Sequence, residues 1–484
     1  MTEVSFSSSG ASPACPAWNS TDWSAAENHV RRLQIRIAKA VRDGKYGKVK
    51  ALQWLLSHSF HGKLLAVRRV TQNRGKNTPG MDGVIWRTPH QKMQAVLSLR
   101  RRGYRPKPLR RVYIPKRNGK QRPLGIPTMR DRAMQALYLL GLEPVAETLL
   151  DKNAYGFRSE RSTADAIGQC FKILCQRNSA PWVLEGDIRS CFDKISHAWL
   201  LKHIPMDKAM LGKWLSAGVI ENRRYHQTLE GTPQGGIISP TLMNLTLCGL
   251  ERVAVKAAFW RDKVNVVSYA DDFVITGASR EVLENKVKPA VAAFLGERGL
   301  EFSLEKTKIT QIDEGFDFLG FNVRKYRGKL LIMPAKGNVK AFLGKVRETI
   351  KANATAKTVS LIRILNAQIR GWANYHRHVV AKKVFNRVDH CIFLVLQRWA
   401  RRRHPNKSGH WQQEKYFCSR GGKNWIFFAP IRGRDGKPRR LHLVQAAETP
   451  IRRHVKVRAD ATPYDPAFSA YFLARKRARK GASA

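Results

Sequence analysis

The residues of this sequence best suited to chemistry are two adjacent aspartates, Asp271 and Asp272, and an upstream carboxylate, Asp187. The pair lies between two apolar runs in V-N-V-V-S-Y-A-D-D-F-V-I-T-G (264–277), a pattern that predicts a β-hairpin with its acids at the tip. Neighbouring carboxylates in an apolar hairpin repel each other and resist desolvation, so a cation normally compensates them, and Mg²⁺ prefers oxygen ligands. Taken alone, the pair also fits a solvated Asp-Asp turn.

Asp187 follows a short apolar pattern, Val183-Leu-Glu-Gly, that predicts a strand ending at this carboxylate. Nucleotidyl transfer by two metal ions requires carboxylates that converge on ions roughly 3.5–4 Å apart, one ion activating the attacking oxygen and the other stabilising the leaving oxygen. Asp187 with Asp271 and Asp272, on neighbouring strands, would supply that cluster. The pattern therefore predicts a metal-dependent site for nucleotidyl transfer.

The composition points to a polyanionic partner. The chain of 484 residues has 88 Lys and Arg against 36 Asp and Glu, a net charge of +52 and a pI near 10.7, which favours nucleic acid. Basic ribosomal-type proteins are usually much shorter, and a binder of anionic membranes needs an amphipathic or lipidated anchor that we do not find. The length and a hydrophobic content of 43% predict about two to four globular domains.

Targeting signals are not evident in the sequence. No apolar run approaches the roughly 18 residues of a transmembrane helix. Residues 1–20 lack the basic start and apolar core of a secretory signal and predict a loose tail. The seven cysteines form no C-x-x-C pair, which fits a reducing compartment. We therefore expect a cytoplasmic protein of bacterial or organelle type that associates with nucleic acid and not with a membrane.

The elements that must hold the carboxylates follow from apolar spacing. Trp23 to about Asn73 predicts basic helices, which fit either solvated faces or an RNA-binding arm. Residues 104–135 predict a cationic hairpin with an Asn118-Gly119 turn, followed by the start of a helix. An amphipathic helix is predicted from Glu281 to Leu300, and three helices from about Asn338 to Arg403.

Y-A-D-D (269–272) and D-I-R-S-C-F-D (187–193) resemble the palm of a reverse transcriptase, and other blocks resemble those of group II intron-encoded enzymes. These blocks are R-G-K-N-T-P-G-M-D-G (74–83), N-A-Y-G-F-R (153–158), G-T-P-Q-G-G (231–236) and the maturase-like G-W-A-N-Y-H (371–376). The resemblance, from about residue 18 to the C-terminus, implies an α+β right-hand polymerase with fingers, a ferredoxin-like palm and a helical thumb. The implied regions are a disordered tail (1–20), fingers and palm with an N-terminal extension (21–335), a thumb and maturase domain (336–408) and a basic DNA-binding region (409–484).

The resemblance implies an RNA-directed DNA polymerase that also binds intron RNA to assist splicing and mobility. Two Mg²⁺ ions, with Mn²⁺ as a substitute, would be held by Asp187, Ile188, Asp271 and Asp272. The residues implied to contact nucleotide are Lys116, Arg122, Arg158, Phe192, which would exclude a 2′-hydroxyl, and Gln234. Those implied to contact RNA are Arg370, Trp372, Tyr375 and Arg377. One of Lys306 and Lys308 is a candidate proton donor to pyrophosphate. By residue type alone, these cations fit a solvated surface, and Phe192, Trp372 and Tyr375 fit a core.

The implied partners are group II intron RNA, an RNA template with a DNA primer or target, and deoxynucleoside triphosphates; a homodimer is left open. Many relatives continue into an endonuclease bearing Cys and His, and the sequence after Pro463 holds neither, so we expect no cleavage of the opposite target strand. One alternative is a splicing protein without polymerase activity, which the intact carboxylates disfavour. Another is a retron- or defence-type reverse transcriptase, which the maturase signature and the long C-terminal region disfavour.

Overall fold

The structure is a computed structural model that describes residues 18–115, 119, 121–433 and 435–481. Most of the predicted tail, residues 1–17, therefore lies outside the described residues. Trp18–Ser20 form a short 3₁₀ helix, η1, and Trp18 packs edge-on against Trp23 with ring centroids 4.8 Å apart. Residues 18–20 thus belong to the fold and not to a loose tail.

The predicted N-terminal helices pack on a long central helix, α5 (Met129–Leu149). The 3₁₀ helix η2 (Arg74–Asn77) and α4 (Pro89–Ser98) follow in the chain, and the helices that pack on α5 are α1 (Trp23–Arg42), α2 (Tyr46–His58) and α3 (Phe60–Gln72). Their apolar stripes bury Ile37, Leu56 and Val145 in a common core. Gln34 and Gln53 donate side-chain hydrogen bonds to main-chain carbonyls of α5, which fixes the helices against it.

The predicted cationic hairpin is confirmed. Strands β1 (Leu109–Pro115) and β2 (Gln121–Ile126) pair antiparallel in a four-stranded sheet of order β2-β1-β4-β5 with β4 (Val219–Glu221) and β5 (Arg224–His226). Of the connecting residues, only Gly119 is described, and its positive φ of 78° suits the turn. Lys116 lies outside the described residues.

The central sheet has the order β6-β7-β3-β8, with neighbours antiparallel. Its strands are β3 (Trp182–Asp187), β6 (Asn265–Tyr269), β7 (Asp272–Gly277) and β8 (Lys308–Gln311). Because side chains alternate along a strand, the sheet serves two cores. Leu184 and Ile275 enter one core with α5, and Val183 and Val274 enter the other with α6 and the thumb.

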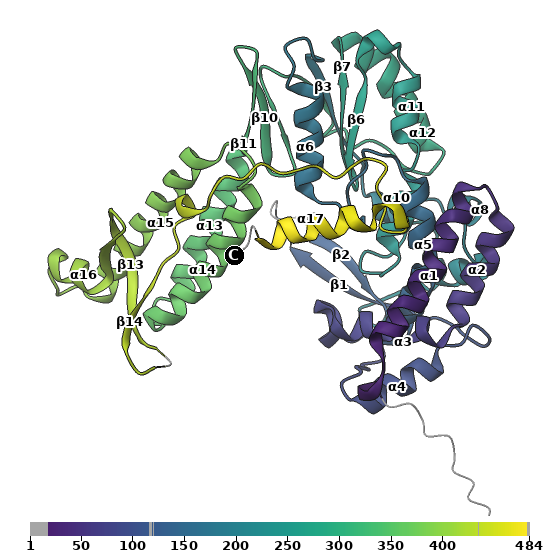
Figure 1. Cartoon of the computed structure of the whole chain (residues 1–484), viewed down its shortest axis with the longest axis horizontal. Helices are drawn as coiled ribbons and strands as arrows, with labels where there is room; N and C mark the ends of the chain where they lie inside the picture. Colours follow the sequence, from purple (N-terminus) through teal and green to yellow (C-terminus); the bar gives the residue numbers. More distant parts are fainter. Residues whose placement is uncertain (1–17, 116–118, 120, 434, 482–484) are drawn as a thin grey trace, which may run out of the picture.

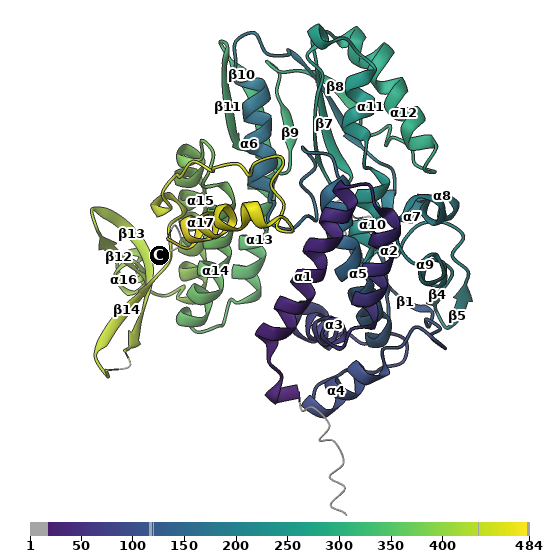
Figure 2. The same cartoon turned by 45° about the vertical axis from the view of Figure 1, so that its right-hand side comes forward.

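Helices cover this sheet on both faces (Figure 2). α6 (Thr163–Leu174) lies on one face, and α11 (Leu250–Lys256) and α12 (Lys288–Gly296) lie on the other. The other helices of this part of the chain are α7 (Cys191–Lys194), α8 (His197–His203), α9 (Lys208–Leu215), α10 (Ser239–Thr246) and the 3₁₀ helix η3 (Trp260–Asp262). The predicted helix 281–300 differs in part, because Val282–Val287 form a π-helix before α12. Pro289, which has no amide to donate, lies just after this junction. None of the described helices has both the length and the apolar character needed to cross a membrane.

The predicted three-helix thumb is confirmed. A sheet of order β11-β10-β9 leads into it, with β9 (Phe316–Phe318), β10 (Phe321–Tyr326), β11 (Lys329–Pro334), α13 (Lys336–Ala352), α14 (Thr358–His376) and α15 (Lys382–Arg403). Phe342, Leu365 and Phe385 are buried between the helices. Beyond them lie α16 (Gly409–Tyr416), β12 (Phe417–Arg420), β13 (Lys423–Arg432) and β14 (Pro438–His442).

After β14 the chain turns back across the molecule from the thumb to the fingers (Figure 1). We call residues 443–481 the C-terminal strap; it contains η5 (Ala446–Glu448), η6 (Pro466–Phe468) and α17 (Ser469–Gly481). Lys382 of α15 donates to the carbonyls of Ala447 and Thr449, and Asp465 forms an ion pair with Arg42 of α1. The region predicted to bind DNA is therefore two structures, a small sheet beside the thumb and a strap that joins the thumb to the fingers.

Candidate active site

The three predicted carboxylates meet at one end of the central sheet. Asp187 is the last residue of β3 and is paired across the sheet with Asp272, the first residue of β7. Asp271 lies in the turn between β6 and β7, beside Ala270, whose φ of 60° closes the turn. The predicted hairpin with its acids at the tip is confirmed, and the register places Asp187 beside them.

Burial and mutual repulsion make these carboxylates hard to ionise together. Asp187 is only 8% exposed. Asp272 is exposed at the start of β7, yet partial desolvation within the cluster, the charge on Asp271 and contact with Asp187 raise the pKa of its carboxyl group. Burial also raises the pKa of Asp271, and the charge of Asp187 adds to this effect. The Lys306 ammonium lies 2.7 Å from Oδ2 of Asp187 and offsets part of this charge.

The donor set fits a divalent cation. Adjacent, partly desolvated carboxylates with raised pKa values are stabilised by a hard cation that takes oxygen ligands. Within the described part of the chain, no three acidic, His or Cys side chains already converge closely enough to hold an ion, and Lys306 contacts Asp187 instead. The carboxylates are therefore ligands of the type that a divalent cation prefers. In this structure the Lys306 ammonium compensates part of their charge.

The main chain at Ile188 adds a further oxygen at this point. Ile188 forms an antiparallel bridge with Phe302. The Arg189 amide donates to the Glu301 carbonyl at 3.0 Å, and the Ser303 amide donates to the Asp187 carbonyl at 2.8 Å. These two hydrogen bonds do not use the carbonyl of Ile188, which stays a candidate ligand.

The two candidate proton donors have different partners. Lys306 contacts Asp187, which raises the pKa of the ammonium through a hydrogen bond and through charge. Lys308 lies 3.2 Å from Glu185, two residues before Asp187 on β3. Only Lys306 of this pair contacts the carboxylate cluster, so it is the candidate that the geometry favours.

The block at residues 153–158 packs against the hairpin that carries Asp271 and Asp272. Ala154 forms a parallel bridge with Ser268 of β6, and the Tyr155 amide donates to the Ser268 carbonyl at 2.9 Å. A Cβ on Gly156 would lie 2.3 Å from the amide nitrogen of Ala270, so only glycine allows this approach to the turn. This block therefore positions the Y-A-D-D turn.

Arg158, expected at the nucleotide, is instead buried behind this block. Its side chain is 2% exposed and forms a bidentate ion pair with Glu147. Its remaining amino group donates to the carbonyls of Asp151 and Ala154 at 2.8 Å. Because these partners occupy the guanidinium, Arg158 holds the block against α5 and does not reach a nucleotide.

Phe192 has a neighbour that sequence reasoning missed. Phe192 is half-buried on α7, and its ring meets that of Phe157 edge to face at 6.4 Å. Phe157 is 57% exposed and has a φ of 55°, a conformation that a bulky residue rarely adopts. In the sequence, the position of Phe157 directly after Gly156 is the feature that could have identified this residue.

The Gln234 loop joins the carboxylate side of the site to the fingers. Gln234 donates from Nε2 to Oδ2 of Asp193 on α7 at 3.0 Å, and its carbonyl accepts from the Gly125 amide of β2 at 2.9 Å. Gly235 has a φ of 121°, and a Cβ there would lie 2.9 Å from the Gly125 carbonyl oxygen. The loop thus needs glycine to pass this close to β2, the strand that carries Arg122.

Arg122 faces the same site from the fingers. Its side chain is exposed on β2, and its positive charge is among the influences that lower the pKa of Asp271. The structure therefore brings together Arg122, Phe192 and Gln234 around the three carboxylates. It does not bring Arg158 to them.

Three family profiles match successive parts of the chain. They are the N-terminal domain of reverse transcriptase over residues 18–99, reverse transcriptase (RNA-dependent DNA polymerase) over 114–323, and the group II intron maturase-specific domain over 339–417. Protein YkfC of Escherichia coli (strain K12) is 33% identical over 309 residues, which cover 54% of this chain and 80% of YkfC. The chain belongs to the group II intron-encoded reverse transcriptases.

A second relative agrees with this family assignment. Group II intron-encoded protein LtrA of Lactococcus lactis subsp. cremoris is 27% identical over 429 residues, which cover 68% of this chain and 70% of LtrA. A solved telomerase from Candida albicans in complex with a telomeric RNA fragment aligns with 64% of each chain at 12% identity and a TM-score of 0.36. Enzymes of the reverse transcriptase family use divalent metal ions, and the group II members combine RNA-directed DNA synthesis with a role in intron splicing.

In this reverse transcriptase, two of the four residues expected to contact RNA belong to the thumb core. Trp372 stacks on Phe342 at 4.7 Å and donates from Nε1 to Asn338. Tyr375 stacks on Phe321 at 5.2 Å and donates its hydroxyl to the Leu319 carbonyl. Because their rings and polar atoms are already engaged, both hold α14 in place and are not free to stack on bases.

The two arginines of that set lie nearer the surface. Arg370 is exposed on α14, and Arg377 is half-buried just after this helix. Arg377 hydrogen-bonds the Asn374 side chain at 3.3 Å, and its carbonyl accepts from Arg452 of the strap at 2.9 Å. Arg370 is therefore the member of the predicted set best placed to meet RNA.

Proposed function

We propose that this chain is itself an active RNA-directed DNA polymerase that binds its intron RNA as a maturase. The observation that carries the proposal is the meeting of Asp187, Asp271 and Asp272 at the end of the central sheet, with a raised pKa at the last two. Adjacent carboxylates whose joint ionisation is opposed in this way are stabilised by a bound divalent cation, which is the group that nucleotidyl transfer requires. Nucleic acid is the partner that the net charge of +52 favours.

The proposed mechanism assigns each residue one role. Asp187, Asp271 and Asp272, with the Ile188 carbonyl, would hold two Mg²⁺ ions, which supply activation of the primer 3′-hydroxyl and stabilisation of the leaving oxygen. Arg122 binds the triphosphate, and the Gln234 loop contacts the new base pair. Phe192 and Phe157 close the space where a 2′-hydroxyl would lie. Lys306, whose pKa is raised by Asp187, holds a proton for the departing pyrophosphate.

Primer extension tests the proposal directly. The purified chain is expected to extend a DNA primer on an RNA template with deoxynucleoside triphosphates and Mg²⁺, to stop when EDTA removes the metal, and to recover when Mg²⁺ or Mn²⁺ is restored. Lack of extension with both metals, in a preparation that still binds intron RNA, would leave a splicing role without polymerase activity and contradict the proposal. Intron RNA, template, primer and nucleotide are the partners that this assay supplies.

Phe192→Val is expected to admit ribonucleotides. The smaller side chain opens the space opposite the sugar, and a contact of this size is worth about 1–3 kcal/mol, or roughly 10-fold or more in discrimination. The ratio of kcat/KM for dCTP and CTP measures it. Phe171→Val, at a 43% exposed ring on α6, is the matched control and should discriminate like wild type. Equal discrimination in Phe192→Val and wild type would make Phe192 ordinary core.

Arg122→Ala is expected to raise the KM for nucleotide by about 10-fold, because a charge-assisted hydrogen bond to phosphate contributes roughly 1.5–3 kcal/mol. Arg224→Ala removes an exposed arginine from β5, at the opposite edge of the same sheet, and controls for the loss of charge. Steady-state kinetics at varied nucleotide concentration measure both variants. A KM in Arg122→Ala that matches Arg224→Ala would remove Arg122 from the site.

A further inference from the structure

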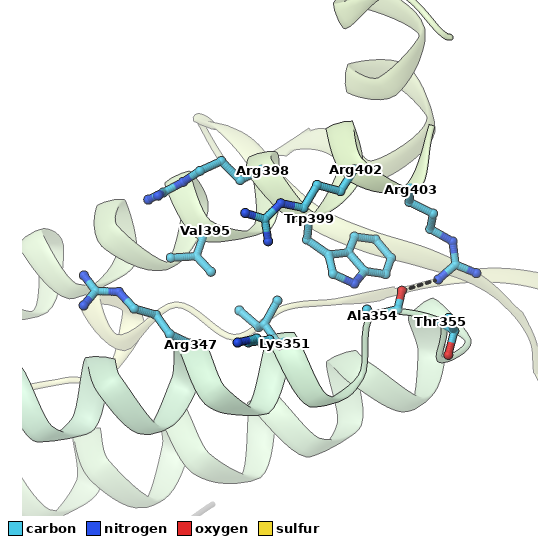
Figure 3. Close-up of a pocket in the computed structure, with 10 residues that line it drawn as sticks. Arg347, Lys351, Ala354, Thr355, Val395, Arg398, Trp399, Arg402 and Arg403 are labelled. Carbon is cyan, nitrogen blue, oxygen red and sulfur yellow. Dashed lines mark hydrogen bonds between the residues drawn. The ribbon is translucent and has the colours of Figure 1, made fainter. Parts of the chain in front are cut away.

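A cavity of about 610 Å³ opens between α13 and α15 of the thumb, away from the carboxylate site. Figure 3 shows side chains of both helices directed into it, with Trp399 between them. Its volume falls within the roughly 300–1,000 Å³ of sites that take small organic molecules or single building blocks. The cavity lies wholly within the stretch that matches the maturase-specific profile, residues 339–417.

The rim of the cavity is cationic on both sides. Arg347 and Lys351 come from α13, and Arg398, Arg402 and Arg403 come from α15. None of the described residues that line the cavity is acidic, and within the described chain none of these five cations forms an ion pair. A concentration of uncompensated cations around one opening favours an anionic ligand, and phosphate is the anion that arginine recognises with directed hydrogen bonds.

The floor of the cavity is apolar and aromatic. Trp399 is 5% exposed, and its indole Nε1 is a buried donor for which the described structure shows no hydrogen-bond partner. The Arg403 guanidinium lies over the indole ring, 5.0 Å from its centre, and its Nη1 donates to the carbonyls of Ala354 and Ala356. A flat apolar wall with an unused N–H suits a planar ligand that carries hydrogen-bond acceptors.

We infer that this cavity binds one unpaired nucleotide of RNA. The base enters between α13 and α15 and accepts a hydrogen bond from Nε1 of Trp399, while the flanking phosphates meet the arginines of the rim. An extruded base combines a planar face, acceptor atoms and adjacent phosphates, and proteins read single-stranded RNA through aromatic and guanidinium planes in this way. An acidic peptide would satisfy the rim and could offer a carbonyl acceptor, but it does not combine a broad aromatic face with an adjacent phosphate.

This inference rests on the proposed function only in its choice of RNA as partner. With no carboxylate in its lining, the cavity has no group to hold a catalytic metal, so its role is to bind RNA and not to react with it. A clamp on one unpaired nucleotide would fix the register of a folded RNA on the thumb. The general +52 charge alone would not do so, because phosphate contacts carry no sequence information.

The test compares three variants of the full chain. Trp399→Phe keeps a smaller aromatic ring and removes the N–H, and Arg402→Gln removes one charge from the rim. Arg401→Gln removes the same charge from the neighbouring exposed residue, which does not line this cavity, and is the matched control. Binding is measured by fluorescence anisotropy with a labelled oligouridylate, its DNA counterpart and a duplex RNA of equal length, over a range of salt concentrations.

The expected result is a loss of affinity for oligouridylate of about 5- to 10-fold in Trp399→Phe. Arg402→Gln should weaken binding more than Arg401→Gln and reduce the salt slope by about 0.7. Oligouridylate carrying 4-thiouridine should crosslink to the peptide that contains Trp399, and duplex RNA or polyglutamate should not compete. Thermal melting establishes that Trp399→Phe is folded, and Arg402→Gln tests the rim independently of the buried ring.

Several outcomes would overturn the inference. For the variants, they are wild-type affinity in Trp399→Phe and identical binding by Arg402→Gln and Arg401→Gln. For the probes, they are crosslinks confined to other helices, competition by duplex RNA or polyglutamate, and a DNA probe whose binding depends on Trp399 as strongly as that of the RNA probe. The assay contains no nucleoside triphosphates, so a failure of primer extension leaves it unaffected. Conversely, a chain that extends primers but shows one of these outcomes would keep the proposed function and lose the cavity assignment.

Discussion

Asp271→Asn is expected to reduce primer extension on an RNA template by on the order of 10³-fold or more, to background in most assays. The substitution removes a charge from the cluster proposed to hold the metal ions, whose stabilisation of the transition state is worth several kcal/mol. Affinity for intron RNA should stay near wild type, because the basic surface and not the carboxylates binds phosphate. Primer extension and filter binding on the same preparation measure the two effects separately.

Asp187→Asn should behave in the same way, since Asp187 is paired across the sheet with Asp272. The control is Asp317→Asn on β9, an exposed aspartate that accepts a hydrogen bond from the Asn322 side chain at 2.8 Å, outside the cluster. Asp317→Asn should extend primers like wild type. Synthesis of full-length cDNA by Asp271→Asn or Asp187→Asn would show that the carboxylate cluster is not required for nucleotidyl transfer.

Asp165→Asn is expected to destabilise docking of the C-terminal strap by about 3 kcal/mol or more, the cost of removing one member of a buried ion pair. Asp165 on α6 is fully buried and accepts from Arg475 at 2.6 Å, from the Val457 amide at 2.7 Å and from His454 at 2.8 Å, all of them strap residues. These bonds hold the pKa of Asp165 well below its usual range although burial acts in the opposite direction. Loss of the charge leaves Arg475 buried without its carboxylate.

Hydrogen exchange at the Val457 amide is the sharpest measurement of this effect, because that amide donates directly to Asp165. Exchange there should accelerate by about 100-fold, since each 1.4 kcal/mol is a factor of ten. Asp465→Asn is the control: it breaks the more exposed ion pair between the strap and Arg42, and such pairs contribute about 0–1 kcal/mol. If both variants protect Val457 equally, the buried cluster is not what holds the strap.

The C-terminal strap links the fingers to the thumb through contacts with three helices. It contacts α15 through Lys382, α6 through Asp165 and α5 through Glu143, which accepts from the Tyr464 hydroxyl at 3.2 Å. These helices lie on either side of the carboxylate site in the chain order, and the strap crosses between them (Figure 1). Basic residues near the C-terminus therefore have an internal partner, and Arg475 is one that is not available to DNA.

Local patterns were enough to predict much of this protein. The hairpin that carries Asp271 and Asp272, the cationic hairpin of β1 and β2 and the three helices from Lys336 to Arg403 all follow from apolar periodicity and turn residues. Apolar periodicity and turn residues involve only a few neighbouring residues, so they can be recognised in the sequence before the fold is known. The pairing of Asp187 with the hairpin is a long-range contact that periodicity does not contain; it was predicted because two-metal chemistry needs a third carboxylate, and the family motifs supported it.

The environment of individual side chains was decided by the tertiary structure. Arg158, Trp372 and Tyr375 have the residue types of ligand contacts, yet packing gives each a permanent partner inside the protein. The reverse holds for Trp399, which by type and spacing is an ordinary core residue and whose N–H is left without a partner beside a cationic cavity. A residue's type and spacing set which bonds it can make, whereas burial and the neighbours brought from distant parts of the chain determine which of those bonds remain for a ligand.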